Sequence, residues 1–260
     1  RGLAKAANER FESGTAFGEA LVAAASATVA VAAPARLRGA TAAMLMEWGP
    51  QPLADALAEI ETAEDGARAV EALKSARRTT AHFLGALALC GARQCPAVAV
   101  AEHEPFRDRL KLGEPTPGEW AAFARAVGLA WAGKSALFPL PGLIGALIAP
   151  AWATFCAELD HERSGVEPAG GEAQARDTLE AILESLHFLR GATLAVVVAG
   201  VASPRLGARR GRSPPALAVD AALPDASVVV LDAEGGLALS LGDLAIWAPA
   251  PVGREEILYW

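Results

Sequence analysis

Apolar residues recur at intervals of three and four over most of the first 190 positions, which predicts a succession of amphipathic helices. The sequence around residue 117 has every feature of a helix N-terminus: Thr116 offers a hydroxyl cap, Pro117 follows in the first turn, and Glu119 stands three positions after the cap. The predicted helices cover residues 3–33, 36–47, 52–62, 63–90, 117–131, 143–162 and 172–190. Residues 91–118 contain four prolines and mixed charge, so we predict a connector there, with a short extended piece at 97–101.

The pattern changes after residue 191. A valine-rich run at 193–201 and shorter apolar runs at 227–232, 237–247 and 256–260 predict strands. The residues Ala233-Glu234-Gly235-Gly236 supply a hairpin turn between two of them. We therefore predict an α+β fold, a mainly α-helical bundle over about residues 1–190 and a small antiparallel β-meander over 191–260 packed on the bundle.

Composition narrows the class of protein. The 260 residues include 62 alanines, 53% are apolar, and the formal net charge is −7. Such a chain is too apolar for a disordered tail, and three cysteines cannot build a disulfide scaffold. An odd cysteine count and the absence of a charged-then-apolar leader predict a cytoplasmic protein. A mildly acidic chain also lacks the basic face of a general nucleic-acid binder.

One stretch raises the question of a membrane span. Residues 135–157 carry no charge and have about the length of a spanning helix. Three prolines at positions 139, 141 and 150 interrupt the stretch, which favours a loop followed by a buried core helix. We therefore predict no membrane partner.

A phosphate-binding loop pattern occurs once, from Gly128 to Ser135, with Lys134 and Ser135 as its phosphate and Mg²⁺ residues. A working loop follows a buried strand and opens a helix, whereas here a helical pattern comes before it and prolines come after it. P-loop-like nucleotide binding at 128–135 is therefore our third interpretation.

Two other groups of residues suggest chemistry. Cys90 and Cys95, with Cys156 and His161, supply four possible zinc ligands, but both spacings are looser than those of zinc knuckles, and we predict no metal and no cofactor. A basic cluster between prolines is a candidate for gripping a phosphate or an acidic partner surface. Its members are Arg205, Arg209, Arg210 and Arg212.

The order of elements resembles a helical module with a closing β-meander found in bacterial signalling and defence proteins, similar to the HEPN superfamily. The resemblance covers most of the chain, except that residues 35–112 look like an elaboration of it. The segments that carry it are Glu9–Glu12, Phe17–Val22, Glu114–Trp120, Leu143–Glu162, Leu186–Leu189 and Leu223–Asp232.

The resemblance gives a sequence criterion for ribonuclease activity. HEPN ribonucleases use an Arg and a His a few residues apart, commonly across a dimer. His161 falls at the histidine position, but Thr154, Phe155 and Cys156 occupy the positions open to arginine. Without a guanidinium there, nothing would stabilise the charge of the scissile phosphate. Arg77 and His82 satisfy the spacing elsewhere in the chain.

We therefore predict a non-catalytic regulatory or protein-interaction domain of a bacterial signalling or antiviral defence system. Its partner would be another protein or a second copy of the chain, and membership of a larger complex is a further option. The alternative is a HEPN-type, metal-independent ribonuclease that uses Arg77, His82 or His161.

Overall fold

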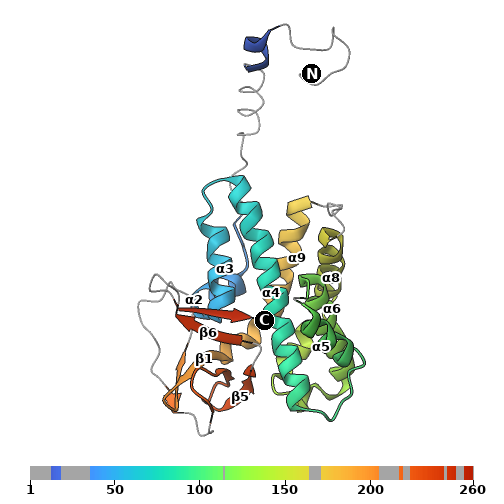
Figure 1. Ribbon diagram of the computed structural model, residues 1–260, viewed down its shortest axis with the longest axis vertical. Helices are drawn as coiled ribbons and strands as arrows, with labels where there is room; N and C mark the ends of the chain where they lie inside the picture. Colours follow the sequence, from blue (N-terminus) through green and yellow to red (C-terminus); the bar gives the residue numbers. More distant parts are fainter. Residues whose placement is uncertain are drawn as a thin grey trace.

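Helices make up most of the residues that the structure describes, and a small antiparallel sheet follows them, as Figure 1 shows. The computed structural model describes residues 13–18, 36–113, 115–163, 171–204, 217–218, 223–242, 245–249 and 255–259. The predicted α+β class, mainly helical, is confirmed. Most of the helix predicted over residues 3–33 lies outside the described residues.

The helices pack around α4, which runs through the middle of the bundle with α3 on one side and α6 and α8 on the other (Figure 1). In chain order they are α2 (Ala40–Trp48), α3 (Gln51–Thr62), α4 (Gly66–Gln94), α5 (His103–Leu112), α6 (Pro117–Trp131), α7 (Pro141–Ile148), α8 (Pro150–Arg163) and α9 (Gly171–Ser185). Two 3-10 turns, η2 (Ala132–Leu137) and η3 (Leu186–Gly191), extend α6 and α9. Helices α2 to α4 contribute to the same core as the later helices.

The predicted start of α6 is confirmed in detail. The Thr116 hydroxyl accepts a hydrogen bond from the Glu119 N–H, and the Glu119 carboxylate accepts one from the Thr116 N–H. Asp65 caps α4 in the same manner by accepting from the Arg68 N–H. These caps satisfy backbone groups that a helix leaves without partners at its first turn.

Two helical predictions were wrong. The connector at 91–118 contains helix α5, which buries Phe106 between Trp120 and Phe123 of α6. The helix predicted over 143–162 is two helices, because Ala149 is extended before Pro150. A residue that precedes proline avoids the helical region, so the break follows from local sterics.

Glycines allow the central helices to approach closely. A Cβ placed on Gly85 of α4 would lie 2.6 Å from the Trp120 ring of α6. On Gly128 of α6 it would lie 2.7 Å from the Leu147 Cβ of α7. Because atoms cannot approach this closely, both positions need a residue without a side chain.

The sheet has five strands in the order β3-β2-β1-β4-β5, and every described pairing is antiparallel. A separate two-stranded sheet pairs β6 with β7. The strands are β1 (Thr193–Val198), β2 (Val201–Pro204), β3 (Leu217–Ala218), β4 (Val228–Leu231), β5 (Leu237–Ser240), β6 (Ala245–Pro249) and β7 (Glu255–Tyr259). The single strand predicted over 237–247 was wrong, since β5 and β6 belong to different sheets.

The predicted hairpin turn joins β4 to β5. Asp232 accepts hydrogen bonds from the N–H groups of Glu234 and Gly236, and Gly235 takes a φ of 83°, which favours glycine. Alternate residues of the sheet, Leu194, Val196, Val228, Val230 and Leu239, share the core of the helices. The sheet therefore packs on the bundle through one face.

Candidate functional site

Arg77 lies inside the bundle instead of on its surface. It is on α4 and is 1% exposed, and its guanidinium donates to two carboxylates of α8. Nη2 bonds Glu158 Oε2 at 2.8 Å, and Nη1 bonds Glu162 Oε1. Glu158 and Glu162 are four residues apart, so they stand on the same face of α8 and receive the guanidinium together.

The Glu158 carboxylate is held by more than Arg77. Its other oxygen accepts from the Thr178 hydroxyl at 2.8 Å and from the Gln174 amide at 3.2 Å, both on α9. The Arg77 guanidinium also lies 5.4 Å from the centre of the Phe155 ring. One buried carboxylate thus connects α4, α8 and α9 through charge-assisted hydrogen bonds.

This arrangement neutralises the cation that a ribonuclease would need. Both terminal nitrogens of Arg77 are occupied by carboxylates, and its side chain is 2% exposed. A phosphate would have to displace both carboxylates and reach the interior of the bundle. Removing one partner of a buried ion pair is strongly unfavourable, so the ion pairs of Arg77 hold α4 against α8.

The candidate histidines lie in different surroundings. His82 is half-buried on α4, with its ring 5.9 Å from the Trp120 ring. His161 is exposed on α8. Arg77 and His82 are five residues apart on one helix, which does not place them on a common face.

The local structure does not have the arrangement of a phosphate-binding loop, in keeping with the helical pattern that precedes the motif in the sequence. Gly128 and Trp131 belong to α6, and Lys134 and the half-buried Ser135 lie in the 3-10 turn that follows. The segment is therefore the C-terminal end of a helix, where carbonyl oxygens predominate and the helix dipole disfavours a phosphate. Lys134 is exposed.

The three cysteines are free thiols. Burial raises the pKa of the Cys90 thiol to about 12 and that of the Cys156 thiol to about 11, since a desolvated thiolate is disfavoured. Cys90 instead donates weakly to the Leu241 carbonyl at 3.5 Å and so links α4 to the sheet. Within the described residues, no group of three or more His, Cys, Asp or Glu side chains is arranged to hold a metal ion.

The basic cluster predicted to grip a phosphate lies outside the described residues. It comprises Arg205, Arg209, Arg210 and Arg212. The structure therefore leaves its role as a prediction.

Three large apolar side chains are exposed on the end of α6, on η2 and on α7, three consecutive elements that pack against one another. They are Leu129, Leu137 and Ile148, which are 59%, 66% and 43% exposed. Between Arg125 and Glu158 the only charged residue of the sequence is Lys134. We call this the α6–η2–α7 surface. Large exposed apolar side chains grouped in this way mark interaction sites more often than isolated ones do.

The uncharged stretch was tested as a membrane span. Among the described residues, no single helix is long and apolar enough to cross a membrane. Helix α7 and most of α8 satisfy the length and composition criteria only as a pair, and that pair bends by 63° at its break.

No family model, curated protein or solved structure matches the chain.

Sequence reasoning did not identify the partners of Arg77. From the sequence, no role was assigned to Glu158, Glu162 or Thr178. A signal was present, because Glu158 and Glu162 stand four apart on a helix that also presents Trp152, Phe155 and Leu159 to the core. A carboxylate that becomes buried on such a face needs a compensating partner, as Glu158 has in Arg77.

Proposed function

We propose that this chain is a non-catalytic regulatory domain that acts by association, and that its partner at the α6–η2–α7 surface is a second copy of the chain. The exposure of Leu129, Leu137 and Ile148 on a segment whose one charged residue is Lys134 carries the proposal. Burying these side chains against another protein removes apolar area from water, which is the main driving force of association.

Charge supports a second copy as the partner. Each chain carries a formal charge of −7, so two copies repel over most of their surfaces. The segment between Arg125 and Glu158, which supplies most of the α6–η2–α7 surface, contains no acidic residue and a single lysine, Lys134, so it contributes little to this repulsion. Two copies can therefore approach through this surface without bringing carboxylates of that segment together.

The glycines of the surface also leave room for a partner. A Cβ on Gly133 or Gly145 would meet no atom within 4 Å, so both glycines face open space. Leu137 of η2 is exposed on the same group of elements. A two-fold interface is formed by one patch on both sides, and small exposed residues let the two backbones approach.

The resemblance noted above would place such a domain in a bacterial signalling or antiviral defence system. In that setting, association of two copies would bring together the larger proteins or complexes that contain them. The neutralised Arg77 supports a regulatory role over the ribonuclease alternative, since its guanidinium already binds two carboxylates.

Sedimentation velocity over a wide range of protein concentration tests the proposal. We expect the wild-type protein to shift from monomer to dimer and Leu137→Lys to remain monomeric, because the lysine would place an additional charge in the interface. Leu112→Lys is the matched control: Leu112 is 83% exposed on α5, outside the α6–η2–α7 surface, and this variant should dimerise normally. A wild-type protein that stays monomeric throughout would overturn the proposal.

The non-catalytic part has a separate test. Purified protein incubated with RNA in the presence of a chelator should leave the RNA intact. Cleavage by the wild-type protein that disappears in a folded His82→Ala variant would overturn this part and establish the ribonuclease.

A further inference from the structure

The short non-helical segment that leads into α2 is bound by two other helices, α3 and α9. The Leu37 N–H donates to the Glu61 carboxylate of α3 at 3.0 Å. The Arg38 N–H donates to the Glu180 carboxylate of α9 at 2.9 Å. Leu37 is half-buried and packs against the core, whereas Arg38 is exposed. Hydrogen bonds from backbone N–H groups to carboxylates are charge-assisted and stronger than neutral ones.

The same kind of contact continues in the first turn of α2. The Thr41 hydroxyl donates to the Glu184 carboxylate of α9 at 2.8 Å. A Cβ on Gly39 would lie 2.5 Å from the Glu184 Oε1 atom, so the glycine leaves room for that carboxylate. We call residues 36–48, which are this segment and α2, the arm, and we call the three glutamates that hold it the α3–α9 site.

The arm is anchored by few buried side chains. Ala42 and Leu45 are its fully buried residues, and the others are half-buried or exposed. Among the described residues, no side chain caps the N-terminus of α2. Elements with few buried contacts open locally at a lower free energy than the whole protein unfolds. We therefore expect the arm to open while the rest of the bundle stays folded.

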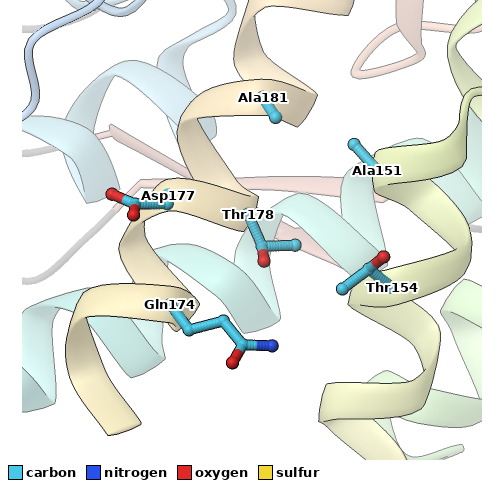
Figure 2. Close-up of a pocket in the computed structure, with 6 residues that line it drawn as sticks. All are labelled: Ala151, Thr154, Gln174, Asp177, Thr178 and Ala181. Atoms are coloured by element: carbon cyan, nitrogen blue, oxygen red, sulfur yellow. The ribbon is translucent and has the colours of Figure 1, made fainter. Parts of the chain in front are cut away.

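The two helices that hold the arm have other contacts in the bundle. Helix α3 packs along α4 and buries Leu57 and Ile60. Figure 2 shows Thr178 and Gln174 on the side of α9 that faces α8, where both side chains donate to Glu158. Because these contacts do not involve the arm, we expect the α3–α9 site to persist when the arm opens.

The connection between α2 and α3 has the features of a hinge. It consists of Gly49 and Pro50, which interrupt a helical stretch that runs from residue 40 to residue 62. A Cβ on Gly49 would lie 2.4 Å from the Leu45 carbonyl oxygen, so the turn needs a residue without a side chain. Pro50 keeps the preceding residue out of the helical region. The position of the arm in its own chain therefore depends on these two residues.

We propose that the arm is exchangeable: when it opens at Gly49 and Pro50, the α3–α9 site binds the arm of a second copy of the chain. The arm of a second copy has the identical sequence, so it forms the same hydrogen bonds as the chain's own arm. Exchange of an identical element is a low-cost route to a dimer, and short hinges favour it. The proposal does not depend on the α6–η2–α7 surface, so either can fail without the other.

Amide hydrogen exchange, followed by ¹H–¹⁵N NMR, tests whether the arm opens. The protection factor of the Leu45 amide in α2 should be at least about tenfold lower than that of the Leu84 amide in α4. Arg38→Pro removes the N–H that donates to Glu180 and should lower the protection of Leu45 further. Arg38→Gln keeps that N–H and should behave as the wild type does. Equal protection of Leu45 and Leu84 in the wild-type protein would overturn the proposal.

A hinge variant tests the exchange itself. Gly49→Ala combined with Pro50→Ala favours a continuous helix through the hinge, which carries the arm away from its own α3–α9 site. In the Leu137→Lys background, sedimentation velocity should show a dimer that persists on dilution, whereas Leu137→Lys alone stays monomeric. Adding Glu180→Leu, which removes one acceptor of the site, should weaken that dimer at least about tenfold. A folded hinge variant that stays monomeric contradicts the exchange.

A labelled peptide of residues 36–48 tests the site without a change in the hinge. By fluorescence anisotropy, this peptide should bind the Arg38→Pro protein at least about tenfold more tightly than the wild type, whose own arm competes at a high effective concentration. Glu180→Leu added to Arg38→Pro should weaken the binding, and a peptide of the same composition in scrambled order should not bind. If the Arg38→Pro protein does not bind the peptide, or binds the scrambled peptide equally well, the α3–α9 site does not accept a second arm and the proposal fails.

Discussion

The guanidinium of Arg77 and the carboxylate of Glu158 lie 2.8 Å apart in the interior and connect α4 to α8 across 81 positions of sequence. Glu162, one turn further along α8, accepts a second hydrogen bond from the same guanidinium. A buried cation of this kind stays favourable only while its carboxylates remain in place.

Replacing Arg77 should therefore be costly. Arg77→Met leaves two carboxylates without their counter-charge, and we expect the free energy of unfolding to fall by about 3–5 kcal/mol. Urea-induced unfolding measures this loss. Arg78→Met is the matched control, because Arg78 is the exposed neighbour on the same helix, and its effect should stay within about 0.5 kcal/mol.

A compensating variant distinguishes charge from packing. Arg77→Met combined with Glu158→Gln and Glu162→Gln removes all three charges, so most of the lost stability should return. If the combined variant is no more stable than Arg77→Met alone, the charge argument is wrong and the guanidinium acts through its packing.

The contact between Gly85 and Trp120 gives a second prediction. A Cβ at position 85 would lie 2.6 Å from the indole ring and 3.2 Å from the Trp120 carbonyl oxygen. We expect Gly85→Ala to reduce the free energy of unfolding by about 1–3 kcal/mol, since α4 and α6 would have to separate.

Gly145 is the control for this glycine, because a Cβ there meets no atom within 4 Å. Gly145→Ala should increase stability by up to about 1 kcal/mol, as alanine restricts the unfolded chain and favours the helix. Both substitutions are best measured by urea unfolding in the Leu137→Lys background, where association does not contribute. Equal effects at the two glycines would contradict the close-approach argument.

Local signals predicted much of the fold. The start of α6 was predictable because its signals lie within a single turn: Thr116 and Glu119 bond each other, and Pro117 occupies the first helical position. The β4–β5 turn was predictable for the same reason, with Asp232 and Gly235 in one short segment. Helix α5 was missed because Pro105 lies in its first turn, where proline is tolerated, and was counted as a helix breaker.

The site was less predictable, because its chemistry depends on contacts distant in sequence. Arg77 and His82 were grouped by spacing, yet Arg77 is directed into the core toward α8. Residue types alone do not distinguish a guanidinium that meets a phosphate from one that meets two carboxylates. That distinction required the packing of α4 against α8 and α9.

The cysteines provide a third prediction. Burial raises the pKa of Cys90 to about 12 and that of Cys156 to about 11, so neither forms the reactive thiolate near neutral pH. Cys95 is only half-buried. In the folded protein, iodoacetamide should therefore label Cys95 first, and the other two only after denaturation.

Mass spectrometry of peptides after timed labelling locates the modified cysteines. The denatured protein serves as the control, in which all three should react at similar rates. Labelling of Cys90 in the native protein as fast as that of Cys95 would contradict the burial of α4 against the sheet.

The capping box of α6 gives the last prediction, a dependence of stability on pH. The Thr116 N–H donates to the Glu119 carboxylate, and the Arg109 guanidinium lies 3.1 Å from it, which together lower the pKa of Glu119 below its ordinary value of 4.5. A lowered folded-state pKa means that the ionised carboxylate stabilises the folded protein at pH values above 4.5. That contribution is lost as the pH falls through the folded-state value.

Glu119→Gln should therefore be less stable than the wild type at neutral pH, and the difference should shrink as the pH is lowered below 4.5. Thr116→Ala, which removes the other half of the box, should cost about 1 kcal/mol at neutral pH. Glu59→Gln, at an exposed position of α3, controls for the loss of one negative charge. Urea unfolding of the four proteins at a series of pH values gives the comparison. A Glu119→Gln difference that stays constant down to acidic pH would show that the side chain acts through its shape and not through its charge.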